Sequence, residues 1–176
     1  FMDMPAKDIT IMDFVDNRSR VKDALDRGVN YVFDRVSEEN YQQLLAKYVG
    51  PGDMIIDLAW NIECNAVLQW CRDNQVLYVN TSVEEWNPYK DSMRNDPTKY
   101  TLYTRHMEIR KRIETWGDNK GTTAVVDHGA NPGLVSHFTK HALLGIVEKI
   151  LKEKPGDPRR PRFEKALADK NFAKLA

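Results

Sequence analysis

Short apolar runs alternate with helical stretches along most of this 176-residue chain. Five runs have the composition of buried strands, at residues 9–13, 30–33, 54–58, 76–79 and 122–127. Because continuous apolar strands alternate with helices, the sequence predicts an α/β fold built on a doubly wound parallel sheet that is covered on both faces. The crossovers between the strands of such a sheet are right-handed.

Helical spacing and capping signals place the helices between these runs. Ser37 is the predicted N-cap of the second helix, since Glu38 and Glu39 follow in the first turn, where the helix dipole favours acids. Glycines are expected to end the first two helices. Gly28 follows the helix at 16–27, and the Gly-Pro-Gly turn at 50–52 follows the helix at 37–49. Helices are expected at 16–27, 37–49, 62–72, 100–116, 133–152 and 163–176.

Helical spacing puts several of the larger side chains of the last two long helices on one side of each. The 100–116 helix carries Tyr103, Met107, Arg110 and Ile113 along one side, and the 133–152 helix has an apolar stripe of Leu134, Val135, Phe138, Ala142, Leu143, Ile146 and Ile150. A linker with three prolines, residues 154–162, follows the longer helix. The chain is therefore expected to divide into a nucleotide-binding domain over residues 1–153 and a linker and helix over residues 154–176.

Composition narrows the classes of partner. Twenty-six basic and 26 acidic residues cancel, which gives no reason to expect nucleic acid or an anionic membrane as partner. No apolar run is long enough to span a bilayer, and no signal peptide is visible. Cys64 and Cys71 lie seven residues apart on one helix, beyond the reach of a disulfide, so we expect buried thiols and a cytoplasmic location.

Ligands bind at the carboxyl ends of the strands in a doubly wound sheet, so the residues there are the candidates for a site. Asp13 ends the first run, where the acid of a Rossmann-like fold accepts hydrogen bonds from a ribose and repels the extra phosphate of NADP. The alternative is that Asp13 only caps a turn, and Arg18 nearby weakens the preference for NAD. Asp34 is either a neighbour of the adenine or a surface acid paired with Arg35. The Gly-rich phosphate loop and its strand are absent from this sequence.

The third and fourth runs lead into loops with polar groups. Ala59 is small enough for a cofactor to approach, and Asn61 is either a ligand of the cofactor or a helix N-cap. Residues 80–86 bring together hydroxyls, acids and an indole, a combination that suits an ammonium group. A solvated loop with a half-buried tryptophan is the alternative reading of residues 80–86.

Residues 127–137 are the strongest local signal. Asn131 is predicted as the N-cap of the long helix and Pro132 as a residue of its first turn. Gly129 and Gly133 allow another group to come close to the backbone. His128 and His137 are expected to have structural roles.

Three runs in these loops resemble homospermidine synthases, a branch of the saccharopine-dehydrogenase-like group. They are DLAWNIECNAVLQWC at 57–71, YVNTSVEEW at 78–86 and VVDHGANPGLVSHFTKHAL at 125–143. The resemblance implies that the chain is part of the NAD-binding half, without the Gly-rich first strand and the C-terminal substrate half. It also implies an NAD-dependent transferase of polyamine biosynthesis that joins two putrescines and releases ammonia, a homo-oligomer when full-length, and inactivity of the isolated chain.

The resemblance assigns roles to individual residues. Asp13 would bind the ribose, Glu84 would bind or deprotonate an amine, and Asn131 would contact the nicotinamide or the reacting amine; Glu84 and Asn131 are therefore the predicted catalytic residues. Glu85 is a further substrate-binding candidate. It stands where the family leads us to expect proline, as Asn61 stands where we expect an acid. The predicted cofactor-binding residues are Asp13, Asp34, Ala59, Trp60, Asn61, Thr81, Ser82, Asn131 and Pro132, and no metal is implied.

Two other functions remain open from sequence. One is a saccharopine or carboxynorspermidine dehydrogenase-like oxidoreductase using NAD or NADP, which would favour basic residues in the pocket, whereas these loops offer acids. The other is a non-catalytic Rossmann-like module, which the absent Gly-rich loop favours.

Overall fold

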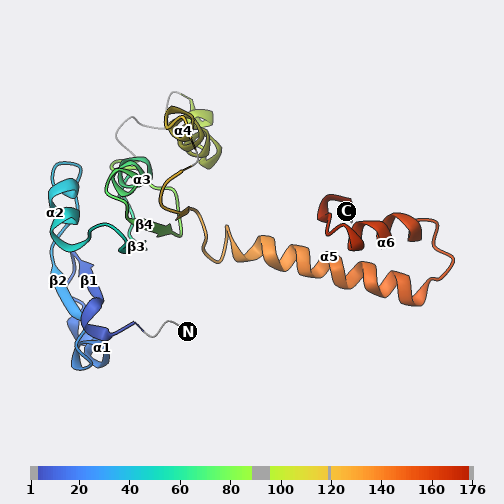
Figure 1. Ribbon diagram of the computed structural model, residues 1–176, viewed down its shortest axis with the longest axis horizontal. Coiled ribbons are helices and arrows are strands. Elements are labelled where there is room, and N and C mark those ends of the chain that lie inside the picture. Colours follow the sequence, from blue (N-terminus) through green and yellow to red (C-terminus); the bar gives the residue numbers. More distant parts are fainter. Residues whose placement is uncertain (1–3, 89–95, 119, 175–176) are drawn as a thin grey trace. The chain divides into compact units, whose positions relative to one another are not determined.

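The computed structural model describes residues 4–88, 96–118 and 120–174. The chain forms two compact units, one of residues 1–79 and 83–125 and the other of residues 80–82 and 126–176. The first unit contains both sheets, and the second contains a pair of helices (Figure 1). We describe each unit by itself.

The first unit begins with a two-stranded parallel sheet. β1 (Thr10–Asp13) pairs with β2 (Asn30–Phe33), and Asp13 lies opposite Phe33 in the register. A short 3-10 helix, η1 (Ala6–Asp8), precedes β1. The predicted helix over 16–27 is shorter than expected, as η2 (Arg18–Arg20) and α1 (Lys22–Asp26). The hydroxyl of Tyr31 explains the late start, because it accepts a hydrogen bond from Asn17 N and keeps that residue out of the helix.

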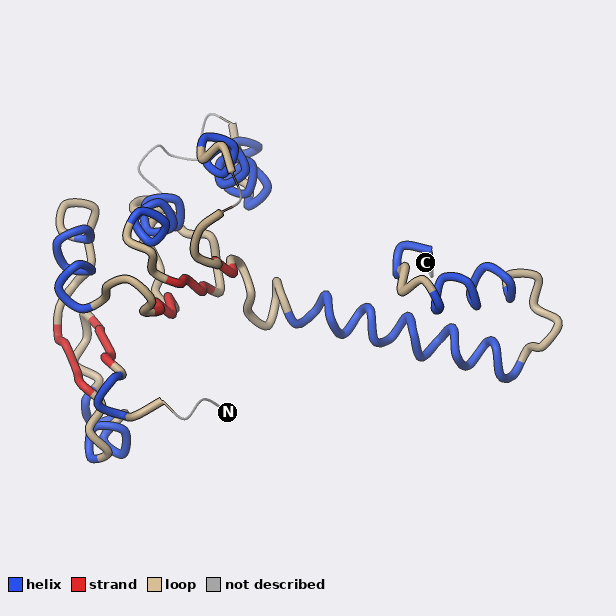
Figure 2. The backbone as a smooth tube through the Cα atoms, in the orientation of Figure 1, coloured by secondary structure: helices blue, strands red, loops and turns tan. Residues whose placement is uncertain are grey.

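A three-stranded sheet follows, made of β3 (Met54–Asp57), β4 (Leu77–Asn80) and β5 (Ala124–Val125). β4 and β5 are parallel, with Tyr78 opposite Ala124. β5 is shorter than the predicted run at 122–127, because Asp127 has a left-handed φ of 59° that an extended strand does not accommodate. The strands appear as separate short segments in Figure 2.

The described strands form two sheets, where the sequence predicted one. The strand order of a doubly wound dinucleotide fold gives the reason, because it places the Gly-rich first strand between the second and the fourth. β1 corresponds to the second strand and β3 to the fourth, and this sequence contains no Gly-rich strand to join them. The α/β fold with parallel, Rossmann-like strand pairing is confirmed.

Three longer helices belong to the first unit: α2 (Tyr41–Tyr48), α3 (Cys64–Asp73) and α4 (Leu102–Thr115). α2 begins later than Ser37, since the side chain of Asn40 bonds back to Ser37 N and to the carbonyl of Arg35 and closes a turn there. α4 is capped by Thr101, whose hydroxyl accepts a hydrogen bond from Thr104 N, and it follows η3 (Pro97–Tyr100).

The core of the first unit surrounds α3 and β4. Its buried apolar side chains are Leu44, Cys64, Val67, Leu68, Trp70, Cys71, Val76, Tyr78, Val83 and Ile109. Both cysteines are buried free thiols, as predicted. α4 buries Ile109, whereas Tyr103 is 73% exposed.

The second unit is built on a helical hairpin. α5 (Leu134–Glu153) matches the predicted long helix, and α6 (Arg160–Ala168) runs back alongside it, followed by η4 (Phe172–Lys174) (Figure 1). Their shared core is Val147, Phe163 and Ala166, with Leu144, Ile150, Leu151 and Leu167 packed around it. Of the predicted α5 stripe only Leu143 and Ile150 are half-buried, and the rest is wrong, since its other members are exposed, Phe138 by 66% and Ile146 by 56%. No helix in the described ranges combines the length and the apolar character needed to cross a membrane.

Candidate functional site

Asp13 ends β1 with its carboxylate held by the following turn. Oδ1 accepts a hydrogen bond from Val15 N at 2.9 Å and Oδ2 accepts one from Asn17 Nδ2 at 2.8 Å. These bonds lower the pKa of Asp13, so it stays ionised at neutral pH. Each carboxylate oxygen retains capacity for a further donor, as a ribose site requires. Arg18 pairs with Asp16.

Asp34 lies next to Asp13 at the same end of the sheet. Its backbone N–H donates to the carbonyl of Asp13 at 3.1 Å, which extends the pairing of β1 and β2 by one bond. Its carboxylate accepts a hydrogen bond from the backbone N–H of Arg35, while the Arg35 guanidinium lies over the Phe14 ring at 5.5 Å. The two acids that we predicted as cofactor ligands are thus brought together.

A second hydrogen-bonded carboxylate, that of Asp57, lies where β3 ends. Asp57 Oδ2 accepts a hydrogen bond from the Tyr78 hydroxyl at 2.8 Å, and Oδ1 accepts one from Ala59 N at 3.0 Å. Burial raises the pKa of Asp57, the two hydrogen bonds oppose that rise, and the negative charge of Glu84 adds to it. Asp57 and Tyr78 were not predicted as site residues, although a strand-ending acid is the same signal that identified Asp13.

The turn after Asp57 carries three predicted cofactor residues. Asp57 fixes the backbone of Ala59, Trp60 follows with 66% of its surface exposed, and Asn61 takes a left-handed φ of 58°. Asparagine tolerates this conformation better than most residues. The N-cap position of α3 is Glu63, so the alternative role of Asn61 as N-cap is wrong.

The loop of residues 83–86, which we call the acidic loop, is held by both neighbouring helices. Glu84 O accepts a hydrogen bond from Cys64 N, the first residue of α3, at 3.1 Å. Arg105 of α4 donates from Nη1 to Val83 O at 2.8 Å, and its Nε lies 3.3 Å from Glu85 Oε1. The Trp86 ring packs against Tyr41 with centroids 5.5 Å apart. The acidic loop is therefore held by contacts with both helices, and Trp86 is half-buried, as the alternative reading of residues 80–86 expects.

In the second unit a buried asparagine organises the loop before α5. Asn80 is 2% exposed, and its Oδ1 accepts a hydrogen bond from Asp127 N at 2.7 Å. The carbonyl of Asn80 accepts a second bond from His128 N at 3.0 Å. Asp127 is 9% exposed and takes the left-handed conformation that ends β5. Asn80 and Asp127 begin the two segments singled out from sequence, 80–86 and 127–137, but no role was predicted for either, because only the fold shows that they meet.

Two glycines close the 129–133 loop against itself. Gly129 N donates to Pro132 O at 2.8 Å, and Leu134 N donates to Gly129 O at 2.9 Å. If Gly133 carried a Cβ atom, that atom would stand 2.5 Å from Gly129 O, and a Cβ atom on Gly129 would stand 3.3 Å from Thr81 Cβ. The two glycines therefore allow the close approach to the backbone that the sequence predicted. Thr81 therefore packs against the 129–133 loop.

Asn131 and Pro132 precede α5 without belonging to it. The N-cap is Gly133, with φ 116°, and the Asn131–Pro132 peptide bond is cis. The predictions of Asn131 as N-cap and of Pro132 as a first-turn residue are therefore wrong. The His128 and His137 rings meet edge to face, with centroids 5.5 Å apart.

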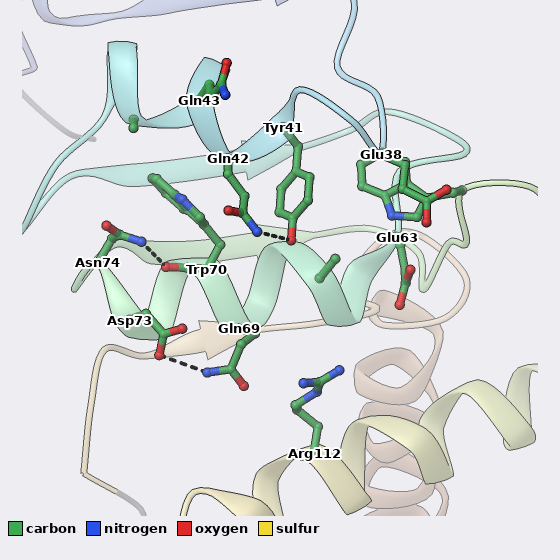
Figure 3. A pocket seen from close by; sticks show the side chains of 13 residues that line it. Glu38, Tyr41, Gln42, Gln43, Glu63, Gln69, Trp70, Asp73, Asn74 and Arg112 are labelled. Carbon is green, nitrogen blue, oxygen red and sulfur yellow. Dashed lines mark hydrogen bonds between the residues drawn. The ribbon is translucent and has the colours of Figure 1, made fainter.

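A separate pocket of about 870 Å³ lies between α2 and α3 (Figure 3). Figure 3 shows Tyr41, Gln42 and Gln43 above it, Gln69 and Asp73 of α3 beside it, and Arg112 of α4 reaching towards it. None of the predicted catalytic or cofactor-binding residues lines this pocket. Of the acidic loop, only Trp86 contributes to its wall.

An α/β domain with parallel strands, an ionised aspartate ending β1 and ordered polar loops after β3 and β4 defines a nucleotide-binding domain of the Rossmann type. The family described as Saccharopine dehydrogenase NADP binding domain matches residues 2–125, and the chain belongs to it.

The chain is also similar to homospermidine synthases. It is 31% identical over 147 residues to the enzyme of Blastochloris viridis and 31% identical over 146 residues to that of Mesorhizobium japonicum, with 81% of this chain covered in each case. The crystal structure of homospermidine synthase from Legionella pneumophila in complex with NAD matches with a TM-score of 0.66 and 27% identity over 84% of this chain. The chain spans 30%, 29% and 29% of the lengths of these three proteins.

Proposed function

We propose that the chain is part of the NAD-binding half of a homospermidine synthase, which joins two putrescine molecules and releases ammonia. The similarity to three homospermidine synthases supports this assignment. The observation that carries it from the residues is the acidic loop, which hydrogen bonds from α3 and α4 hold near the half-buried carboxylate of Asp57. Fixed carboxylates suit diamine substrates, whose ends are ammonium groups at neutral pH.

The residues at the end of β1 fit an NAD molecule. Asp13 is ionised and half-buried, and its carboxylate retains acceptor sites for the two ribose hydroxyls. The same charge would repel the additional phosphate of NADP, which favours NAD. Bound NAD supplies a reversible hydride acceptor, so the amine carbon is oxidised and the new imine is reduced without net redox change. Asp34, Ala59, Trp60, Asn61, Thr81, Ser82, Asn131 and Pro132 are the further proposed cofactor contacts.

The chain's own residues would move protons and hold the amine. Glu84 would bind the ammonium end of putrescine and accept a proton from it, which leaves a neutral amine ready for oxidation or attack. Asn131, fixed before α5 by the loop of Gly129 and Gly133, offers an amide that can donate and accept hydrogen bonds to the nicotinamide or the amine. Glu85 remains a weaker candidate for binding the second ammonium, since Arg105 already pairs with it.

Activity of the full-length protein tests the proposal. Incubation with putrescine and NAD⁺ should yield homospermidine and ammonia without net accumulation of NADH. Glu84→Gln should abolish turnover and leave NAD affinity unchanged, whereas Asp23→Asn, on the exposed surface of α1, should match the wild type. Steady accumulation of NADH would instead favour a dehydrogenase. NAD binding without formation of any product would favour a non-catalytic Rossmann-like module.

Two wider assignments accompany this proposal. Residues 1–153 would form the nucleotide-binding part, and residues 154–176, of which α6 packs on α5, would lead towards the substrate-binding part of a longer protein. A cytoplasmic location is consistent with the free thiols of Cys64 and Cys71.

A further inference from the structure

Asp57 connects the turn after β3 to the neighbouring strand β4. Its Oδ2 accepts a 2.8 Å hydrogen bond from the hydroxyl of Tyr78, and its Oδ1 accepts a 3.0 Å hydrogen bond from Ala59 N. Tyr78 is 1% exposed and belongs to β4, the middle strand of its sheet. The carboxylate therefore ties the turn to a side chain that the core holds in place.

The turn has little else to fix it. Leu58 and Trp60 are 71% and 66% exposed, so burial does not hold their side chains. In the part of the chain that the structure describes, the Asp57 carboxylate makes the only hydrogen bond to residues 59–61. Asn61 also has a left-handed φ of 58°, a conformation that needs support from its surroundings.

The position of this turn in the fold gives the anchor its importance. β3 corresponds to the fourth strand of the doubly wound dinucleotide fold, in which the strand order reverses between the first and fourth strands. Dinucleotides bind in the crevice outside the carboxyl ends of the strands at that reversal. The turn at residues 58–61 follows the carboxyl end of β3, so it lies at the edge where the proposed cofactor binds.

We propose that Asp57 is a positioning residue for NAD: supported by Tyr78, its carboxylate holds the turn of Ala59, Trp60 and Asn61 in the conformation that contacts the cofactor. This inference rests on the proposed function, in which these three residues are cofactor contacts, and it adds the residue that orders them. A turn that is ordered before the ligand arrives loses less conformational entropy on binding, so the anchor increases the affinity for NAD.

Three substitutions separate the hydrogen bonds of Asp57 from its charge. Asp57→Ala removes both acceptors. Asp57→Asn loses the charge but keeps both contacts, because the amide oxygen can accept from Ala59 N while the amide N–H donates to the Tyr78 hydroxyl. Tyr78→Phe removes the hydroxyl and leaves the ring in the core.

The test uses the full-length protein and two independent readouts. Hydrogen exchange of the Ala59 amide without NAD reports the order of the turn, and calorimetry measures the Kd for NAD. Asp57→Ala should speed that exchange and raise the Kd roughly tenfold to a hundredfold, whereas Asp57→Asn should recover the affinity to within about threefold of the wild type. Tyr103→Phe is the matched control at a side chain that is 73% exposed, and it should change neither readout.

A double variant tests whether Tyr78 acts through Asp57. Tyr78→Phe alone should raise the Kd for NAD by about threefold to tenfold, the effect of one hydrogen bond. Added to Asp57→Ala, it should cause no further loss, because the carboxylate that receives the hydroxyl is already gone.

The inference and the proposed function fail in different ways. If the wild type binds NAD and Asp57→Ala or Tyr78→Phe binds it equally well, the positioning role is overturned, as it is by a further loss in the double variant. A wild type that binds no NAD would refute the proposed function and this inference with it. The expected affinities in a protein that forms no homospermidine would support the positioning role and refute only the reaction.

Discussion

Replacing Gly133 with alanine tests the loop that is proposed to present Asn131. Gly133 has a φ of 116°, which side-chain-bearing residues rarely adopt. The new Cβ would stand 2.5 Å from Gly129 O, 2.8 Å from Gly129 N and 2.9 Å from His128 Nδ1. Two of these atoms belong to the backbone, so the clash cannot be relieved by rotating a side chain.

The cost of Gly133→Ala follows from the contacts that must change. The unfavourable φ costs about 1–3 kcal/mol. Moving Gly129 away breaks its bonds with Leu134 N and Pro132 O, at roughly 1 kcal/mol each. The sum is a loss of about 3–5 kcal/mol of local stability. Gly145→Ala is the matched control: Gly145 lies inside α5 with nothing within 4 Å of its added Cβ, so the same change should stabilise by about 0.5–1 kcal/mol.

Hydrogen exchange of the full-length protein measures both effects locally. In Gly133→Ala the amides of Gly129 and Leu134 should lose protection, while amides at the end of α5 keep theirs. NAD affinity should fall in the same variant if Asn131 contacts the nicotinamide. Unchanged protection at Gly129 and Leu134 would refute the described loop, because two backbone atoms and an added Cβ cannot share the same space.

Three further perturbations follow from the packing and the charges. Phe163→Ala should destabilise the hairpin of α5 and α6 by about 3–5 kcal/mol, seen as faster hydrogen exchange in α6, because the ring is 4% exposed, whereas Phe138→Ala, at a site 66% exposed, should have little effect. Cys64 and Cys71, each 1% exposed, should resist iodoacetamide until the protein unfolds, since burial also raises the pKa of Cys71 to about 12; rapid labelling of the native protein would contradict their burial. Burial raises the pKa of Asp57 above 3.8 in the folded state, so the folded protein binds its proton more tightly than the unfolded chain does, and the free energy of unfolding should fall as pH rises from about 3.8 through the raised pKa. Asp57→Asn should remove that fall from urea titrations at a series of pH values, and an unchanged pH profile would show that Asp57 is not desolvated.

Local signals predicted the elements well where the residues involved are close in sequence. The ends of α5 and the burial of both cysteines on α3 follow from spacing along one helix. The site residues at strand ends follow from the rule that a doubly wound sheet binds ligands there. Asp13 and Asp34 lie together because β1 and β2 pair in parallel.

Features that depend on distant partners were not predictable in this way. The stripe of α5 was assigned to the wrong side because apolar residues surround the helix, and only the packing of Phe163 selects Val147 for burial. Arg105 carries no sequence signal, since its contacts are with residues twenty or more positions away, Glu85 and Val83. Asn131 has the chemistry of an N-cap, but the bond from Gly129 N to Pro132 O folds the chain into a loop before the helix begins.

The fate of the hydrogen removed from putrescine tests the central claim most directly. Full-length protein would be incubated with NAD⁺, unlabelled NADH and putrescine that is deuterated at both amine-bearing carbons. The mass of the homospermidine formed would then be measured by mass spectrometry. A homospermidine synthase that holds one NAD through both half-reactions returns the same deuterium, so the product should retain every label. Homospermidine that lacks one deuterium, or deuterated NADH that accumulates in solution, would contradict the account.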